Sequence, residues 1–377
     1  MNYFEESLEL HQKNQWKLET TSKIPVETQH DLSTAYSPGV AQPCREIYEK
    51  PEKIYDYTLK WNTIAVISDG SAVLGLGNIQ DKASLPVMEW KCVLFKEFWE
   101  VNAFPVILNT QDPDEVVDTI KKISNWFGGI NLEDIAAPNC FYIEERLKNE
   151  LDIPVFHDDQ HWTAIVTLAG LINWLKITEK EKSEIKVVIN WLGAAGIAIV
   201  KLLKSFGVED IIVCDSKWII SSKRSDLNQE KQKILEITNK DDISWNLSDA
   251  CKNKDVFIWV SVANALTKED IKSMNKDPMI FAMANPVPEI MPEDAADAGA
   301  KIIATWRSDY PNQLNNVLVF PWVFKWALKN KVTSITEDMK INAAICLADH
   351  ILSPTPEKII PSPLDKTVSQ TIAKNIL

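Results

Sequence analysis

Short apolar runs alternate along the chain with longer stretches in which apolar residues recur every three or four positions. The short runs predict strands, and the longer stretches predict amphipathic helices. The predicted strands span residues 63–67, 104–108, 154–156, 186–190, 210–214, 255–260, 279–283 and 301–305. The clearest predicted helices span residues 83–98, 113–124, 141–150, 161–177, 194–206 and 336–352. Apolar strands separated by helices are typical of parallel sheets covered on both faces, so the pattern predicts an α/β fold.

Two domains are expected, because 377 residues exceed the usual size of one domain. The boundary is expected near residues 157–162, since a new unit of strand, glycine turn and helix follows it. We therefore expect an N-terminal α/β domain over residues 1–160. A C-terminal Rossmann-type domain with a doubly wound parallel sheet is expected over residues 161–377.

Composition narrows the classes of function. The chain carries 40 basic and 53 acidic residues, a formal net charge of −13, which argues against non-specific nucleic-acid binding. No run approaches the roughly 20 apolar residues of a membrane span, and no secretory signal is evident, so a cytoplasmic protein is expected. The six cysteines form no CxxC pair and are expected to be buried free thiols.

The segment KVVINWLGAAG predicts a dinucleotide site, because a strand leads through a glycine turn into a helix. Gly193 and Gly196 would let the backbone approach a pyrophosphate at the helix N-terminus. Asp215 ends the next strand, 19 residues after Gly196, where a carboxylate can accept ribose hydroxyls and favours NAD over NADP. Trp191 replaces the first glycine of the fingerprint, so a turn packed by small residues is the alternative. Asp215 could instead cap a helix.

Two pairs of adjacent acids follow apolar runs. Glu133 and Asp134 stand in GGINLEDI, and Asp158 and Asp159 stand in IPVFHDDQH. Neighbouring carboxylates at strand ends repel each other unless a hard cation lies between them, and oxygen ligands suit Mg²⁺ or Mn²⁺. The alternative is a set of solvated loop acids or helix caps.

Lys91 lies in the apolar stretch PVMEWKCVLFKEF, where lost solvation is expected to lower its pKa and suit it to act as a general base. Lys96 is the rival in the same stretch, and a lysine that snorkels to solvent is the alternative for both. Tyr36, in LSTAYSPGVAQP, could be held near a ligand by the surrounding Pro/Gly loop, or be an ordinary half-buried tyrosine.

Asparagines follow or approach the late strands. Asn285 stands in ANPVPE, and Asn315 and Asn316 stand in NQLNNVLVFP. Their amides can fix a carboxylate or amide ligand, and turn formation is the alternative.

Together these segments resemble the malic enzyme family in its shorter bacterial form. The resemblance covers roughly residues 10–350 in the family's order. The matching stretches are LSTAYSPGVAQPC, ISDGSAVLGLGNI, ASLPVME, LFKEF, DPDEVV, FGGINLEDI, IPVFHDDQH, VVIN with GAAGIAI, CDSK, ANPVPEIMP, RSDYPNQLNNVLVFP and ITEDMK.

The resemblance implies the oxidative decarboxylation of malate to pyruvate and CO₂, with NAD(P) and Mg²⁺ or Mn²⁺. It assigns the first domain to substrate and metal, with the active site in the cleft between the domains, and implies a homodimer with the N-terminal helix near the interface. The implied residues are Glu133, Asp134 and Asp159 as metal ligands, Lys91 as general base, Tyr36 as general acid, Asn285 and Asn315 at the malate or nicotinamide side with Asn316 as a weaker candidate, and Gly193, Gly196 and Asp215 for NAD.

One departure from the family is systematic. The chain has 14 tryptophans and only 11 glycines, where about 7% glycine is usual. The family pattern has glycine at Trp61, Trp90, Trp162, Trp191, Trp218, Trp259, Trp306, Trp322 and Trp326. Trp16, Trp99, Trp126 and Trp245 also stand in glycine-like contexts, and Trp174 is less clear.

We hypothesise that these positions are glycines encoded by UGA, a codon that different genetic codes read as tryptophan or as glycine. Ordinary UGG codons would refute this. If the tryptophans are real, Trp191 obstructs the pyrophosphate site, and the alternative function is an inactive relative that keeps the fold.

Overall fold

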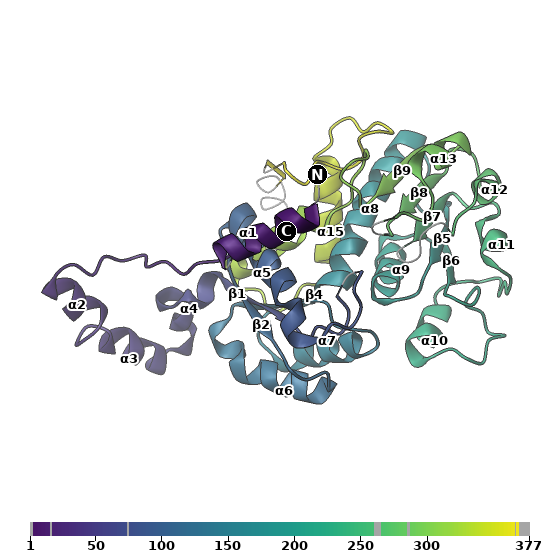
Figure 1. Cartoon of the computed structure of the whole chain (residues 1–377). Coiled ribbons are helices and arrows are strands. Elements are labelled where there is room, and N and C mark those ends of the chain that lie inside the picture. The colour runs from purple at the N-terminus through teal and green to yellow at the C-terminus, as the bar shows by residue number, and fades with distance from the viewer. Residues whose placement is uncertain are drawn as a thin grey trace.

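The computed structural model describes residues 3–15, 17–73, 75–259, 265–284, 287–365 and 367–368, and contains two parallel sheets (Figure 1). The first sheet has the strand order β2-β1-β3-β4. Its strands are β1 (Thr63–Ser68), β2 (Asn102–Ile107), β3 (Gly129–Leu132) and β4 (Val155–His157). The helices that connect them are α5 (Gln80–Trp99), α6 (Pro113–Ile123) and α7 (Asn139–Glu150).

The second sheet has the order β6-β5-β7-β8-β9, and all its neighbouring strands are parallel. Its strands are β5 (Lys186–Asn190), β6 (Asp210–Cys214), β7 (Val256–Trp259), β8 (Met279–Ala282) and β9 (Ile302–Thr305). The chain winds outward from β5 to β6 and then back across to β7, so the order reverses beside β5, where doubly wound sheets bind ligands. The predicted doubly wound α/β fold is confirmed.

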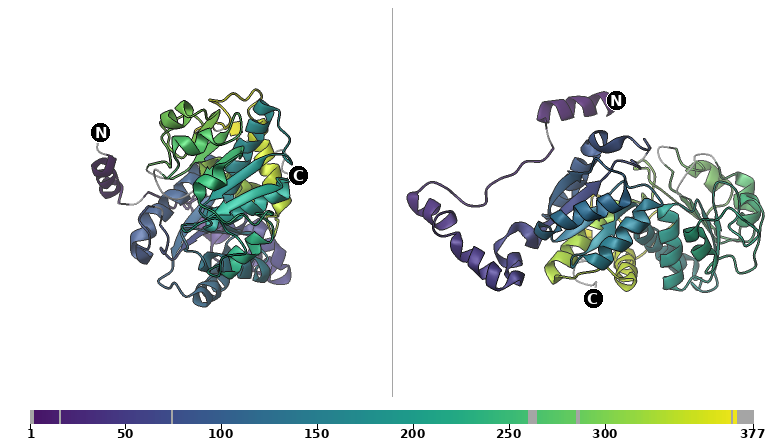
Figure 2. Two further views of the ribbon diagram at one scale, coloured as in Figure 1. Left: turned by 90° about the vertical axis from the view of Figure 1, so that its right-hand side faces the viewer. Right: turned by 90° about the horizontal axis from the view of Figure 1, so that it is seen from below.

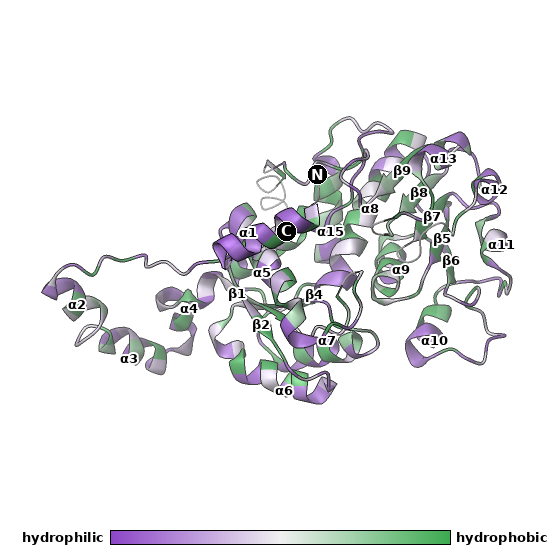
Figure 3. Cartoon of the chain, viewed as in Figure 1, coloured by the Kyte–Doolittle hydropathy of each residue, from purple (hydrophilic) through white to green (hydrophobic). Residues whose placement is uncertain are grey.

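Helices cover both faces of the second sheet (Figure 1). On the face toward the first sheet lie α8 (Asp158–Thr178), α9 (Ala194–Phe206) and α15 (Glu337–Asp349). On the outer side lie α11 (Leu247–Cys251), α12 (Lys268–Lys272) and α13 (Pro292–Asp297), with α10 (Gln229–Leu235) at the sheet's edge beyond β6. Colouring by hydropathy shows that the strands are largely hydrophobic, whereas the surrounding helices carry many hydrophilic residues (Figure 3).

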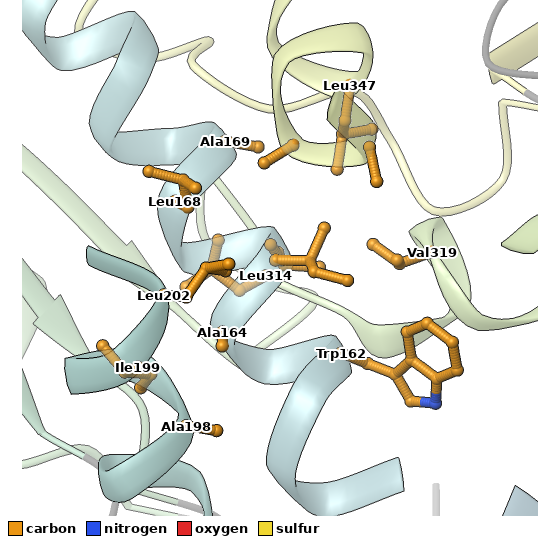
Figure 4. Packing of buried hydrophobic residues seen from close by; sticks show 14 of the residues in the cluster. Trp162, Ala164, Leu168, Ala169, Ala198, Ile199, Leu202, Leu314, Val319 and Leu347 are labelled. Carbon is orange, nitrogen blue, oxygen red and sulfur yellow. The ribbon is translucent and has the colours of Figure 1, made fainter. Parts of the chain in front are cut away.

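Helix α8 belongs to the core that both sheets share. It is buried along most of its length and packs against α9 and α15. Leu168, Leu202 and Leu347 lie on these three helices, in one buried cluster (Figure 4). Helix α14 (Phe320–Asn330) returns to the first sheet, where the Phe320 and Phe324 rings lie 4.9 and 5.7 Å from that of Phe95 in α5. The expected boundary at residue 160 therefore falls inside α8, and residues beyond it also pack on the first sheet.

The N-terminal helices project from the body in two places, α1 on its own and α2 with α3 as an arm (Figures 1 and 2). Helices α1 (Tyr3–Asn14), α2 (Gln29–Ala35) and α3 (Ala41–Glu49) bury no residue. The short helices α4 (Ile54–Tyr57), η1 (Pro51–Lys53) and η2 (Leu59–Asn62) lead from the arm into β1. We did not predict α2 or α3, because their few apolar residues face no core.

The predicted strands are all present, within one or two residues of their expected ends. Strand β3 was not predicted, because GINL is short, begins with glycine and contains the polar Asn131. Helix α8 begins at Asp158 rather than residue 161. Among the described residues, no helix is both long and apolar enough to cross a bilayer.

The expectation of buried thiols holds for only some of the six cysteines. Cys92, Cys140, Cys214 and Cys251 are buried, whereas Cys44 is exposed and Cys346 is partly exposed. Burial raises the pKa of Cys214 to about 12, and it raises the pKa of the other three buried thiols as well.

We predict that the native protein reacts rapidly with a thiol reagent at Cys44 and more slowly at Cys346, because only thiolates react and only these two sites are accessible. The four buried thiols should react only after unfolding. Counting modified thiols with time by mass spectrometry checks this. Rapid labelling of Cys92 in the native protein would contradict the packing of α5.

Candidate active site

The two acid pairs meet because their strands are neighbours. Strands β3 and β4 are parallel, and Leu132 pairs with His157 at their carboxyl ends. Glu133 and Asp134 follow β3 directly, and Asp158 and Asp159 open α8 directly after β4. The register therefore delivers four carboxyl groups to one edge of the first sheet.

Three of these carboxyl groups form a set that suits a divalent cation. One oxygen each from Glu133, Asp134 and Asp159 lies within 4.8 Å of the others, and Glu133 and Asp134 are buried. Burial, followed by repulsion from Asp158, raises the pKa of Glu133 well above its usual value, and burial also raises the pKa of Asp159. A cation would relieve this repulsion, and an all-oxygen set fits Mg²⁺ or Mn²⁺. The three predicted ligands are thus brought together.

Lys91 of α5 reaches the same group of acids. Its Nζ lies 3.1 Å from Glu133 Oε1 and 3.0 Å from Asp158 Oδ1, and 4.5 Å from the centre of the Phe320 ring. The rival Lys96 instead donates to Asn102 at the exposed end of β2. The expected fall in the pKa of Lys91 is wrong. Burial lowers that pKa, but the carboxylates of Asp158 and Glu133 outweigh burial and raise it.

Polar groups around the acids hold them in place. Asn131 donates from Nδ2 to Glu133 Oε2 over 2.8 Å. The loop after β1 supports Asp134, because Ala72 N–H donates to the Asp134 carbonyl and Ser71 Oγ accepts from Ala136 N–H. Ser71 in turn donates to Asp69, which is 2% exposed. We did not predict this supporting role of the loop, because the segment ISDGSAVLGLGN was noted only for its resemblance to the family.

Of the two adjacent asparagines, the weaker candidate, Asn316, contacts the site, whereas Asn315 does not. Asn316 Nδ2 lies 3.3 Å from Asp158 Oδ2, so the weaker candidate touches the site. The Asn315 side chain accepts from Val317 N–H and caps η4 (Asn316–Leu318). Asn285 lies outside the described residues. Asp158, which we noted only as part of an acid pair, is a site residue through its contacts with Lys91 and Asn316.

The turn after β5 has the backbone of a dinucleotide site. Gly193 caps α9, and a Cβ on Gly196 would lie 2.3 Å from the Trp191 carbonyl oxygen, so the close turn requires glycine at 196. Ala194, the first residue of α9, packs against the apolar cluster of the first sheet, which brings this helix terminus to the boundary between the sheets. The backbone fits a pyrophosphate.

Asp215 follows β6, where an adenosine ribose is expected. Its carboxylate is held by Arg224 through bonds of 2.7 and 3.0 Å and by Lys231 at 2.5 Å. Burial raises the pKa of Asp215, but the bonds from Arg224 and Lys231 outweigh it and keep the group ionised. Asp215 also accepts from Lys217 N–H, so it organises the loop that follows β6.

Comparison with known proteins assigns this geometry to a family. A family model described as the malic enzyme N-terminal domain matches residues 15–148, and one described as the malic enzyme NAD binding domain matches residues 161–377. The chain belongs to the malic enzyme family. Its relatives include the bifunctional malic/malolactic enzyme of Bacillus subtilis, 56% identical over 100% of this chain and 92% of that one.

Other malic enzymes agree in sequence and fold. The NAD-dependent malic enzyme of Geobacillus stearothermophilus is 50% identical over 96% of this chain and 76% of that one. A crystal structure of the NAD-dependent malic enzyme of Thermotoga maritima superposes with a TM-score of 0.95, at 46% identity over 98% of both chains. Further relatives are named NADP-dependent malic enzymes.

Tyr36, the family's implied general acid, lies apart from the acids of its own chain. It ends α2 on the projecting arm, and its side chain is 71% exposed (Figures 1 and 2). This separation could not be predicted, because the spacing of residues along a chain does not show in which direction an arm extends.

The structure bears unevenly on the tryptophan hypothesis. Trp191 has φ of +82°, and it is the one tryptophan of the described residues with a left-handed backbone, a conformation that favours glycine. The indole nitrogens of buried Trp162 and Trp259 have no hydrogen-bond partner. Trp162 projects from α8 on the side of Val319, stacked on Phe156 (Figure 4). Trp174 gives no such argument, because its Nε1 donates to the Asp277 carbonyl.

Trp191 also bears on the dinucleotide site. A Cβ on Gly193 would meet the Trp191 indole at 3.2 Å, so the ring lies against the turn that a pyrophosphate would use. The alternative of an inactive relative is nevertheless unsupported, because both malic enzyme domains match and the acids and Lys91 assemble as a site.

We predict that Trp191→Gly stabilises the protein by about 1 kcal/mol, because glycine relieves the left-handed backbone, and tightens NAD binding about tenfold or more, because the turn is uncovered. Denaturant unfolding and calorimetric titration with NAD measure the two effects. Trp245→Gly is the control, since that side chain is 66% exposed and its backbone is not left-handed. Equal effects of both substitutions would contradict the prediction.

Proposed function

We propose that this malic enzyme catalyses the oxidative decarboxylation of malate to pyruvate and CO₂, with NAD and a divalent cation, Mg²⁺ or Mn²⁺. The observation that carries the proposal is the convergence of Glu133, Asp134 and Asp159 with the Lys91 ammonium alongside. Oxygen ligands beside a lysine suit a 2-hydroxy acid, whose carboxylate and hydroxyl can share one cation.

Each group has a defined task. The cation, held by Glu133, Asp134 and Asp159, would polarise the hydroxyl and carboxylate of malate and offset the negative charge that keeps Lys91 protonated. Lys91 would accept the proton of the malate hydroxyl, and NAD, when bound, would supply the hydride acceptor. Asp158 orients Lys91 through their 3.0 Å contact, and Asn316 fixes Asp158 from the opposite side. Asn285 and Asn315 are proposed on the malate or nicotinamide side.

NAD is the proposed cofactor, with Gly193 and Gly196 at the pyrophosphate and Asp215 at the ribose. An ionised Asp215 accepts the ribose hydroxyls and repels a 2′-phosphate. Arg224 and Lys231 offset part of that repulsion, so NADP is expected as a poorer second cofactor. We also propose a cytoplasmic location, since buried free thiols suit a reducing compartment.

We predict equal formation of pyruvate and NADH from malate in the presence of Mn²⁺, and its loss on chelation. Asp159→Ala should lower kcat/KM roughly 100-fold or more, because one of three metal ligands is lost. Asp118→Ala, an exposed acid on α6, should leave it unchanged. The assay is run on the chain as written and with glycine at its 14 tryptophan positions. Absence of turnover in both contradicts the proposed function, and turnover in the glycine form alone supports the codon hypothesis.

We propose that the enzyme is a homodimer in which the arm of one protomer carries Tyr36 into the site of its partner. The exposed N-terminal helices support this, because Leu8 and Tyr48 are 73% and 90% exposed and α1, α2 and α3 contain no buried residue. Exposed apolar surface on helices without a core marks an association surface. Tyr36 would then protonate C3 of the decarboxylated product.

Mixed dimers test this arrangement. Tyr36→Phe and Lys91→Ala should each be inactive alone. Random mixing of the two should restore about a quarter of the activity, because half the dimers are mixed and each mixed dimer has one intact site. The specific activity of co-expressed variants measures it. No recovery in mixed dimers, verified by differently tagged protomers, places Tyr36 in its own chain's site and overturns the arrangement.

A further inference from the structure

A buried carboxylate outside the ligand set touches the segment that carries Asp158 and Asp159. Glu144 of α7 is 5% exposed. Its Oε1 accepts from the backbone N–H of His157 over 3.0 Å and contacts His161 Nε2 over 2.8 Å, and Lys148 Nζ lies 2.7 Å away. Burial alone would raise the pKa of Glu144, but His161 and Lys148 outweigh it and keep the carboxylate ionised.

The two contacts of Glu144 bracket the metal-ligand segment. His157 precedes Asp158, and His161 lies two residues beyond Asp159, so one carboxylate fixes both ends of the first turn of α8. No side chain caps α8 at His157, and Glu144 accepts from the His157 N–H from another helix, as the N3 side chain does in a capping box.

The orientation of His161 is fixed from its other side. Lys340 of α15, 3% exposed, lies with Nζ 3.0 Å from His161 Nδ1 and bonds to Glu337. Because an ammonium only donates, Nδ1 must accept, and Nε2 therefore carries the proton given to Glu144.

The first turn of α8 packs on Phe156 through the His161 ring and faces a cavity beside Glu144 and Lys340. This cavity of about 430 Å³ is lined among others by Glu144, Gln160, His161, Lys201 and Lys340. A helix start that faces a cavity depends in part on hydrogen bonds for its position. The chain from Lys340 through His161 to Glu144 supplies those bonds.

We propose that Glu144 is a positioning residue of this malic enzyme, which sets the metal affinity by fixing the first turn of α8 through His157 and His161. The inference rests on the proposed metal centre. Partners of metal ligands commonly change metal affinity by 10–100-fold when removed, although they do not touch the ion.

Direct titration with Mn²⁺, read by calorimetry or by the electron paramagnetic resonance of free Mn²⁺, tests the proposal without turnover. Glu144→Ala should weaken Mn²⁺ binding roughly 10–100-fold. Glu144→Gln keeps an oxygen acceptor for His157 and should lose less. Glu145→Ala, the exposed neighbour on α7, is the matched control and should bind as the wild type does.

Kinetics separate positioning from general damage. Saturating Mn²⁺ should restore most of the kcat of Glu144→Ala, since a misplaced ligand weakens affinity, whereas a damaged fold lowers kcat at every Mn²⁺ concentration. His161→Gln, which breaks the chain one step away, serves if Glu144→Ala does not fold by circular dichroism, and it should weaken Mn²⁺ binding in the same direction. Folded variants that bind Mn²⁺ like the wild type overturn the positioning role. A wild type that does not bind Mn²⁺ contradicts the proposed metal centre instead.

Discussion

The concentration of negative charge at the carboxyl edge of the first sheet is the constraint on which the rest of the site depends. Glu133, Asp134, Asp158 and Asp159 lie together where water is largely excluded, and like charges in such surroundings repel strongly. Among the residues that the structure describes, Lys91 is the cation that lies within about 3 Å of two of them. The ammonium therefore stabilises the neighbouring carboxylates, and a divalent cation would offset the negative charge that remains.

The surrounding fold can be understood as the means of keeping that charge in register. Parallel pairing of β3 with β4 sets the two acid pairs opposite each other, and α5 directs Lys91 between them. Phe320 of α14 lies over the lysine, so an element from the far end of the chain closes the apolar side of the site. Hydrogen bonds from Asn131 and the Asp69 loop fix individual acids without adding charge. Hydrogen bonds from protein groups, rather than from water, thus hold the mutually repelling acids in position.

Sequence patterns predicted the parts of this arrangement that arise from burial alone. The apolar strands other than β3 and the helices α5 to α9 and α15 were predicted, because apolar runs locate them along the chain. The family resemblance singled out Glu133, Asp134 and Asp159, which the structure brings together. The rise in the pKa of Lys91 was not predicted, since it depends on which carboxylates lie opposite the lysine in space. The exchange of Asn315 and Asn316 escaped for a similar reason, because adjacent amides differ only in which one the backbone turn uses as a cap. Strand β3 was missed because its four residues are too few for a periodic signal.

Helix α8 has a consequence for how the molecule comes apart. Its first turn carries two acids of the first sheet, while its remaining turns pack against α9 and α15 beneath the second. The two halves therefore share helix α8, and unfolding of either half would expose apolar surface of the other. The two halves should consequently unfold together as one cooperative unit under heat or denaturant. A metal bound at the first turn of α8 should then also raise the melting temperature of the nucleotide-binding half.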